Sequence, residues 1–279
     1  MAIVEQKARM TNDPMTKKER YRHFVDYFSQ HSPEPATELH YGTPYELLVA
    51  VILSAQCTDK RINQVTPALF QRFPNPQALA ASSVDEVFNY IRSVSYPNKK
   101  AKHLVGMAKM LVDVFGGEVP SDIDELQKMP GVGRKTANVI ASVIFDAPAI
   151  AVDTHVFRVA NRIGLTTNAR TPLAVEKQLM ENLPKEVLGV AHHWLILHGR
   201  YICVARTPKC EICPLTWFCL YYQSINTETA LLQAAALKAK KAKDLKKVKT
   251  LNKISKELQK RSMDNNGRLS GADNVDKQI

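Results

Sequence analysis

Long apolar runs are missing from this sequence of 279 residues. The longest, LLVAVILSA at residues 47–55, falls well short of the roughly 20 residues that a membrane-spanning helix needs. The opening stretch, MAIVEQKARMTNDP, also lacks the sustained apolar segment of a secretory signal peptide. These absences argue against a membrane protein or a secreted one, and we expect a cytoplasmic protein without a membrane partner.

An alternating polar and apolar pattern, which is typical of half-buried strands, is absent as well. Helical periodicity recurs instead from about residue 16 to residue 218, with Pro, Gly, Asn, Ser or Thr between the segments. The sequence therefore predicts an all-α fold. The segments that we expect to be helical are residues 16–31, 45–56, 83–94, 98–115, 134–145, 156–164 and 174–183.

Negative charge is scarce relative to positive charge. Lys and Arg number 38 against 27 Asp and Glu, which gives a net charge of +11 and a pI near 9.4. This excess raises the expectation of an anionic partner such as nucleic acid. It is unevenly spread, because residues 224–279 carry 13 Lys and Arg against 6 Asp and Glu, a net of +7, which leaves a mildly basic +4 for residues 1–223.

The Lys-rich tail, residues 224–279, ends in a polar stretch that we expect to be disordered. Before that stretch, apolar residues recur at intervals of three or four, which is compatible with a basic amphipathic helix. Three interpretations of the tail remain open: a solvated or disordered extension, an arm that adds affinity for DNA, and a helix that binds a protein partner. The recurring apolar residues are Leu245, Val248, Leu251, Ile254 and Leu258.

Residues 129–140, MPGVGRKTANVI, look at first like the end of a phosphate-binding P-loop. A P-loop requires Gly directly before its Lys, but Arg134 precedes Lys135. Gly131 and Gly133 instead lie between an apolar run and a new helical pattern, so the sequence predicts a tight turn between two helices. The backbone N–H groups at the start of the second helix suit a single anionic oxygen.

Four of the five cysteines fall within residues 203–219, which in a reducing compartment favours a metal site over disulfides. Their spacing, C-x6-C-x2-C-x5-C, supplies the ligands of one 4Fe-4S cluster or of one structural zinc. Zinc sites usually pair two C-x2-C motifs, and only one is present, so the spacing favours iron-sulfur slightly. The clustered residues are Cys203, Cys210, Cys213 and Cys219, whereas the isolated Cys57 is expected to be a buried helix residue without a ligand role.

Several separated segments together resemble one family, the endonuclease III family of DNA glycosylases. MPGVGRKTANVI resembles its helix-hairpin-helix motif, and AVDTHVFRVANRIG resembles the segment that follows it. HHWLILHGRYIC resembles the helix that leads into the cysteine cluster, and the spacing C-x6-C-x2-C-x5-C resembles the cluster loop itself. YELLVAVILSAQ matches further upstream. The likeness covers roughly residues 16–222 in consistent order and leaves out the tail.

The resemblance implies an all-α protein in which two helical domains flank a DNA-binding cleft. The first would be a six-helix barrel domain with the helix-hairpin-helix motif, at residues 37–147. The second would be an iron-sulfur domain made from residues 1–36 and 148–223, followed by the helical or disordered tail at 224–279. The resemblance also favours a 4Fe-4S cluster with a structural role, which shapes a loop whose Arg206 and Lys209 face DNA phosphates.

The implied reaction removes a damaged base, an oxidised pyrimidine, from duplex DNA and then cleaves the strand by β-elimination. A Lys amine can attack the electron-deficient C1′ and form a Schiff base, which acidifies the 2′ hydrogens. Lys135 falls on the family's nucleophile position, although by itself it would be read as a surface Lys that contacts phosphate. Asp153 matches the second catalytic residue and also suits a helix N-cap, whereas His155 is expected to shape the site without acid-base catalysis.

The implied DNA contacts surround the extruded base. Gln56, at the end of the predicted helix 45–56, matches the residue that fills the gap left in the duplex. The family's companion wedge is usually aliphatic, but Tyr96 stands in its place and would stack against a base. In the hairpin turn, the implied phosphate contacts are Gly131, Val132, Gly133 and Arg134.

Two other functions are weighed against this one. An adenine-mismatch glycosylase of the related branch would lack the nucleophile at Lys135 and would carry a further domain that the simple tail does not resemble. A non-catalytic, metal-stabilised DNA-binding module would not need the pairing of Lys135 with Asp153. We therefore expect a monomeric, nucleoid-associated enzyme that binds double-stranded DNA containing damaged bases or abasic sites.

Overall fold

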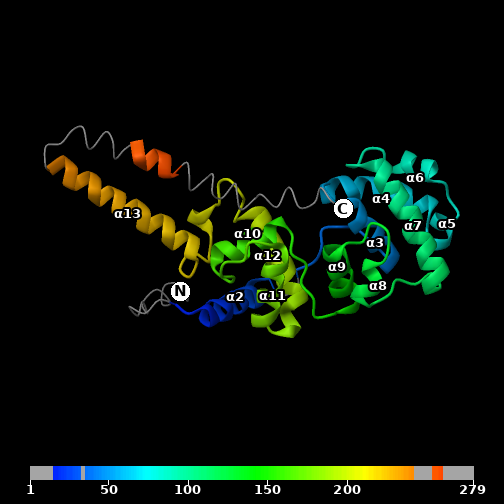
Figure 1. Cartoon of the computed structure of the whole chain (residues 1–279), viewed down its shortest axis with the longest axis horizontal. Coiled ribbons are helices and arrows are strands. Elements are labelled where there is room, and N and C mark those ends of the chain that lie inside the picture. Colours follow the sequence, from blue (N-terminus) through cyan, green and yellow to red (C-terminus); the bar gives the residue numbers. More distant parts are fainter. Residues whose placement is uncertain (1–14, 33–34, 242–252, 260–279) are drawn as a thin grey trace. The chain divides into compact units, whose positions relative to one another are not determined.

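The computed structural model describes residues 15–32, 35–241 and 253–259. All regular secondary structure in these ranges is helical (Figure 1), so the prediction of an all-α fold is confirmed. None of the helices in these ranges is long and apolar enough to cross a bilayer.

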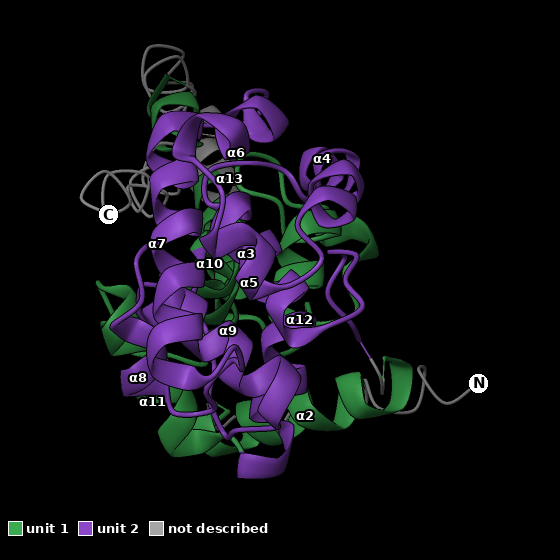
Figure 2. Cartoon of the chain, turned by 90° about the vertical axis from the view of Figure 1, so that its right-hand side faces the viewer, with its two compact units in different colours: residues 1–33, 154–183, 195–272 green, residues 34–153, 184–194, 273–279 purple. Residues whose placement is uncertain are grey.

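The chain divides into two compact units, which Figure 2 shows in different colours. Among the described residues, the first unit contains 15–32, 154–183, 195–241 and 253–259, and the second contains 35–153 and 184–194. The domain limits predicted from the sequence, 37–147, 1–36 with 148–223, and 224–279, remain a proposal.

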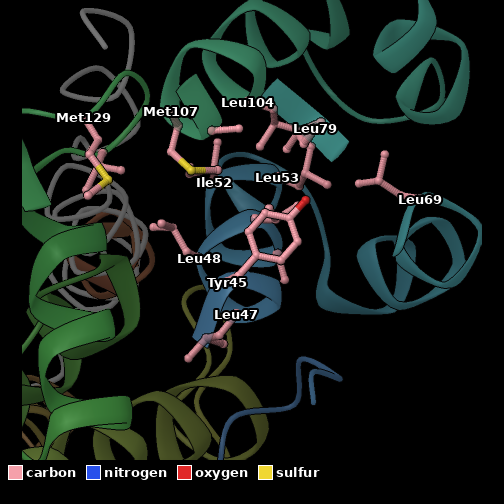
Figure 3. Packing of buried hydrophobic residues seen from close by; sticks show 14 of the residues in the cluster. Tyr45, Leu47, Leu48, Ile52, Leu53, Leu69, Leu79, Leu104, Met107 and Met129 are labelled. Carbon is pink, nitrogen blue, oxygen red and sulfur yellow. The ribbon is translucent and has the colours of Figure 1, made fainter. Parts of the chain in front are cut away.

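The second unit is built around α3 (Pro44–Ser54), which is buried on nearly every side. Its hydrophobic cluster, part of which Figure 3 shows, joins side chains from α3 and from the helices that follow it along the chain. Leu48, Ile52 and Leu53 lie within this cluster. The other helices of the unit are α4 (Asp59–Arg72), α5 (Pro76–Ala80), α6 (Val84–Ile91), α7 (Pro97–Phe115), α8 (Ile123–Gln127), α9 (Arg134–Phe145), the 3-10 turn η2 (Lys185–Val187) and the first residues of α12 (Leu188–Tyr201).

Local signals fix where these helices begin and end. Thr43 accepts a hydrogen bond from the backbone N–H of Glu46, and Pro44 occupies the first turn, as expected of a capped helix start. Pro97 begins α7, and Gly116 ends it in a left-handed conformation with φ of +63°. The N–H of Glu46 at the start of α3 and the carbonyl of Leu111 at the end of α7 are thereby satisfied within a few residues of the chain.

The first unit contains α2 (Lys17–His31), α10 (Thr154–Ile163), α11 (Pro172–Asn182), the last residues of α12, the 3-10 turn η3 (Cys210–Ile212) and α13 (Leu220–Lys241). The N-terminal helix α2 joins residues far along the chain through Gln178 of α11. The Tyr21 hydroxyl donates to the carbonyl of Gln178 over 3.1 Å, and the Lys17 ammonium donates to its side-chain oxygen over 3.0 Å. These bonds explain why α2, at the start of the sequence, belongs to the same unit as α11.

All seven helices predicted from periodicity are confirmed, with ends that differ by at most three residues. The periodic pattern missed α4, because Pro67 lies inside it and Pro in a helix interior is strongly disfavoured. Two details were wrong. Helix α3 ends at Ser54, so that Gln56 lies in the turn that follows it, and Cys57 is half-buried in a bend rather than buried in a helix.

The described part of the tail is helical. Helix α13 covers its beginning, and residues 253–259 form a further helical segment. Of the apolar positions in the predicted amphipathic helix, Leu245, Val248 and Leu251 lie outside the described residues.

Candidate functional site

The predicted hairpin turn lies between α8 and α9. Its backbone is closed by the N–H of Val132, which donates to the carbonyl of Met129 over 3.1 Å. Gly131 has a φ of +82°, and a Cβ added there would lie 2.9 Å from the Cβ of His103. Both the backbone conformation and the close approach of α7 therefore require glycine at residue 131.

The start of α9 is suited to an anion. Gly133 occupies the N-cap position and has no side chain to bond to the first N–H groups of the helix, which point out of the helix end. Val132 is buried and anchors the turn, whereas Arg134 and Lys135 are exposed directly after it. The backbone N–H groups at the helix start thus suit an anion, and two exposed cationic side chains follow the turn directly.

Asp153 is half-buried and lies directly before α10. The segment that leads to it is tied to the helix of Lys135. Asn138, one turn after Lys135 and almost fully buried, donates from its amide to the carbonyl of Ile150 over 3.2 Å. Both predicted catalytic residues therefore belong to the second unit, on segments joined by a buried hydrogen bond.

His192, in the first turns of α12, was missed by the sequence reasoning. Its Nδ1 lies 2.8 Å from the carbonyl oxygen of Ala151, which is two residues before Asp153, so Nδ1 carries the proton of this bond. Burial, and then the neighbouring His193, lower the pKa of His192 to about 4, while Asp153 acts to raise it and Lys135 to lower it. The charges of Lys135 and Asp153 thus both act on the pKa of one buried, neutral ring.

The sequence offered one signal for this residue, a pair of histidines in the apolar stretch HHWLIL. The pair marks a polar group on a buried helix face, but it does not tell which backbone carbonyl the ring meets.

The two predicted gap-filling residues are brought together. Tyr96 is 60% exposed at the N-cap of α7, and Gln56 is exposed in the turn after α3. Between them, the hydroxyl of Ser95 donates to the carbonyl of Gln56 over 2.7 Å. Gln56 and Tyr96 thus lie on two adjoining turns of the second unit.

The four clustered cysteines line one cavity of the first unit. Cys210 begins η3 and Cys213 directly follows it, whereas Cys203 comes after α12 and Cys219 directly before α13. Within the described ranges, no three His, Cys, Asp or Glu side chains form a ready-made site for a single metal ion. Each cysteine of a 4Fe-4S cluster binds a different iron, so thiols that surround a volume suit a cluster. The four residues are Cys203, Cys210, Cys213 and Cys219.

The surroundings of these thiols favour thiolates only when the thiolates bind a positively charged group. Burial raises the pKa of Cys213 to about 12 and that of Cys219 to about 11, so these thiols would ionise only against a strong positive charge. Arg162, from α10, donates to the sulfur of Cys203 over 3.5 Å. Nε2 of His198 lies 3.6 Å from the sulfur of Cys213.

Two cationic side chains project from the same loop. Arg206 and Lys209 are both exposed between the first and second cysteines. Behind them, the loop is held by the N–H of Lys209, which donates to the carbonyl of Ile202 over 2.9 Å. The loop therefore carries positive charge on its surface while its thiols face inward.

Two family models match the chain. Residues 49–185 match the family model of the HhH-GPD superfamily of base excision DNA repair proteins. Residues 203–219 match the iron-sulfur binding domain of endonuclease III. The chain therefore carries an iron-sulfur domain, and its cofactor is a 4Fe-4S cluster.

Individual relatives cover most of the sequence. The chain is 48% identical to endonuclease III of Rickettsia felis over 199 residues, which are 71% of this chain and 93% of that protein. It is 48% identical to endonuclease III of Bacillus subtilis over 195 residues, which are 70% of this chain and 89% of that protein.

Among solved structures, a trapped covalent complex of endonuclease III with DNA matches with a TM-score of 0.71 and 45% identity. The match covers 75% of this chain and 99% of that chain. Because relatives of such high identity are covered almost from end to end, the chain belongs to the endonuclease III family of base-excision repair enzymes, which are DNA glycosylases with AP lyase activity.

Proposed function

We propose that Lys135 is the nucleophile of this glycosylase and AP lyase, and that Asp153 is its second catalytic residue. The observation that carries the proposal is the position of Lys135. Its exposed amine follows directly on a turn that requires glycine and that offers backbone N–H groups to a phosphate. A phosphate held at Gly131 and Gly133 would bring the adjoining sugar within reach of that amine.

The reaction begins with a base turned out of the helical stack. The neutral Nζ of Lys135 attacks C1′ of the deoxyribose, and the bond from C1′ to the base breaks, so that the base leaves with the electron pair and takes up a proton. Asp153, as a carboxylate, accepts the proton that Nζ loses or stabilises the positive charge that develops at C1′. The product is an aminal between Lys135 and C1′.

Strand cleavage follows from the same bond. The nitrogen lone pair forms a C=N bond as the C1′–O4′ bond breaks, and O4′ leaves with the electron pair and takes up a proton. The resulting protonated Schiff base draws electrons from C2′ and acidifies its hydrogens. Loss of a 2′ proton expels the 3′ phosphate, and water then hydrolyses the imine and frees Lys135. The amine of Lys135 donates its electron pair in the attack and in the ring opening, and the protonated Schiff base formed from it accepts electrons in the elimination.

The contacts to DNA divide into three groups. Gly131, Val132, Gly133 and Arg134 would hold the phosphate of the damaged strand. Gln56 would meet the orphaned base through its amide, and Tyr96 would stack in the gap. Arg206 and Lys209 would bind phosphates further along the duplex.

The four clustered cysteines, Cys203, Cys210, Cys213 and Cys219, are proposed as the ligands of the 4Fe-4S cluster. When bound, the cluster would supply a fixed point that holds the loop of Arg206 and Lys209 in shape. The support for this ligand set is that all four thiols line one cavity with cationic side chains beside them. We expect the purified protein to be brown and to contain iron, and an equimolar zinc content without iron would contradict the assignment.

The preferred lesions are proposed to be oxidised pyrimidines in double-stranded DNA, together with abasic sites. The protein is proposed to act as a monomer, and to work on the nucleoid in the cytoplasm. Two alternatives differ in their chemistry: a monofunctional adenine glycosylase would not form a covalent bond to DNA, and a non-catalytic binding module would not release a base. The exposed amine of Lys135 beside the turn favours the lyase over both.

The test is trapping with borohydride, which reduces the Schiff base to a stable amine. The wild-type protein should form a covalent adduct with duplex DNA that contains an oxidised pyrimidine. Lys135→Ala should lose the adduct and keep its affinity for abasic-site DNA. Lys128→Ala is the matched control, because Lys128 is also exposed and lies just before the turn.

Absence of trapping by the wild-type protein would contradict the lyase mechanism. Trapping that survives in Lys135→Ala would assign the nucleophile to another amine. A panel of duplexes with different oxidised bases would then rank the lesions.

A further inference from the structure

Two residues of the second unit hold an unfavourable backbone conformation. In the described part of the chain, four residues other than Gly have a positive φ: Gln56 at +54°, Tyr96 at +55°, Asp146 at +50° and Asn168 at +52°. Asp and Asn tolerate this left-handed region comparatively well, whereas Gln and Tyr have no such local compensation. Each of the latter two conformations is therefore unfavourable by itself, and other contacts must offset its cost.

The side chain of Lys100 supplies one set of these contacts. Lys100 belongs to α7 and is only 5% exposed. Its ammonium donates to the carbonyl of Leu53 over 2.8 Å and to that of Ala55 over 2.7 Å. These carbonyls lie at the end of α3, where the helix itself offers them no partner, so the ammonium fixes the path of the chain immediately before Gln56.

Two further bonds complete the connection. The backbone N–H of Lys100 donates to the carbonyl of Tyr96 over 3.1 Å. The hydroxyl of Ser95 donates to the carbonyl of Gln56 over 2.7 Å. Lys100 and Ser95 thus each join the turn of Gln56 to the turn of Tyr96. Ser95 directly precedes Tyr96, and Lys100 lies one helical turn after it.

We propose that Lys100 and Ser95 are positioning residues that hold Gln56 and Tyr96 ready to enter the duplex before DNA binds. The inference rests on the proposed role of Gln56 and Tyr96 in filling the gap. Because the strained conformations are already formed, binding does not have to supply the free energy that fixes them. The arrangement also holds an aromatic ring, 60% exposed, where it can stack on a base beside the orphaned one.

A purely structural role for Lys100 makes a different prediction. If its ammonium only satisfied the end of α3, its loss would lower stability and affect every DNA substrate equally. If it positions Gln56 and Tyr96, its loss should matter only where a gap must be filled. Single-stranded DNA with an abasic site has no orphaned base and no gap, yet it still presents C1′ to Lys135.

The experiment compares AP lyase cleavage of duplex and single-stranded abasic-site DNA by four variants. Lys100→Met removes the two donated bonds and keeps the apolar stem, and Lys109→Met is the control from an exposed position of the same helix. Ser95→Ala removes the hydroxyl, and Ser95→Thr restores it. Ser95 lies in a loop, so the Ser95 pair carries the test if Lys100→Met does not fold.

We expect Lys100→Met to raise KM for the duplex about tenfold, which corresponds to about 1.4 kcal/mol of lost positioning. Its kcat on the duplex and its KM on single strands should stay within about twofold of wild type, and so should every constant of Lys109→Met. Ser95→Ala should show the same selective loss to a smaller degree, and Ser95→Thr should recover it.

Equal losses on duplex and single strand would show a structural role and overturn the inference. A Lys100→Met variant that matches Lys109→Met on both substrates would overturn it as well. Failure of the wild-type protein to cleave either substrate is a separate outcome, because it would overturn the proposed lyase function and this inference with it.

Discussion

Arg162 donates a hydrogen bond from its guanidinium to the sulfur of Cys203, over 3.5 Å. The same guanidinium donates to the carbonyl of Val204 over 2.8 Å and to that of Ala205 over 2.7 Å. Its carbon centre also lies 4.9 Å from the ring of Tyr221, at the start of α13. One buried side chain of α10 therefore holds the beginning of the cysteine loop and the helix that follows it.

Arg162→Ala should consequently weaken both the fold and the retention of iron. We expect the free energy of unfolding to fall by about 3 kcal/mol, because hydrogen bonds of charged groups contribute roughly 1.5–3 kcal/mol each and two carbonyls lose their donor. Urea unfolding and the rate at which the purified protein loses its iron would measure the two effects.

Arg206→Ala is the control for this prediction, since Arg206 is exposed on the same loop, and its stability and iron content should barely change. Iron retention in Arg162→Ala equal to that in Arg206→Ala would show that the loop does not depend on Arg162.

A second prediction concerns the turn at Gly131. Alanine substitution of three glycines distinguishes the cost of a positive φ from the cost of a steric clash. Gly131→Ala combines a φ of +82° with a Cβ 2.9 Å from that of His103, and should cost on the order of 2 kcal/mol or more. Gly116→Ala has a φ of +63° and no atom within 4 Å, so it should show the backbone cost alone, about 1 kcal/mol. Gly189→Ala meets only ordinary contacts, 3.8 Å from Ser142, and should be close to neutral.

The same three variants test the proposed phosphate contact. Only Gly131→Ala should also weaken binding to abasic-site DNA, because only there would the turn before α9 shift. Thermal unfolding and a binding titration would measure the two effects. Unchanged DNA affinity in a destabilised Gly131→Ala protein would argue against the turn as a phosphate site.

The sequence predicted those features that depend on residues close together in the chain. Periodicity placed seven helices, and Gly131 and Gly133 marked a tight turn between two helices, which the structure confirms between α8 and α9. The cysteine spacing predicted a metal site and favoured iron-sulfur slightly over zinc, the resemblance to the family implied a 4Fe-4S cluster, and the comparisons confirm the iron-sulfur domain. Such features are readable because a cap, a turn or a ligand loop is completed within a few residues.

Partners that are distant in the sequence could not be predicted in this way. Lys100 bonds to Leu53, 47 residues earlier, and His192 bonds to Ala151, 41 residues earlier. Each pairs a buried polar side chain with a backbone carbonyl, and every residue carries such a carbonyl. The sequence therefore shows that a Lys or His lies on an apolar helix, but only the fold selects its partner.

His192 makes a third prediction, on the pH dependence of stability. Its pKa is lowered, chiefly by burial, from an ordinary 6.5 to about 4, so the unfolded chain binds a proton at higher pH than the folded chain. The stabilisation is therefore complete above about pH 6.5, falls as the pH drops toward 4, and is constant below that. On this shift the loss amounts to something on the order of 3 kcal/mol.

Urea unfolding of the wild-type protein and of His192→Gln at a series of pH values would test this. Gln keeps a donor for the carbonyl of Ala151 but does not titrate, so the variant should lose less stability than wild type between pH 6.5 and 4. Parallel curves for the two proteins would show that His192 does not contribute to the acid sensitivity.

Removal of residues 224–279, which cuts α13 after Gln223, is the last prediction. The shortened chain keeps Tyr221, whose ring lies beside Arg162, and Gln223, whose amide donates to the carbonyl of Trp217 over 3.2 Å. The removed segment carries a net charge of +7. If it acts as an arm for DNA, the slope of log K against log salt should become less steep by about 0.9 for each phosphate that it neutralises.

The chemistry of the shortened protein should change little, because the proposed catalytic residues lie in the second unit, before the tail. Binding titrations from low to high salt and single-turnover cleavage would measure affinity and chemistry separately. A full-length protein with seven of the tail's Lys replaced by Gln is the control, since it keeps the segment and brings its net charge from +7 to zero, and it should match the truncation. An unchanged salt slope in both proteins would leave a solvated extension or a protein-binding helix as the interpretation of the tail.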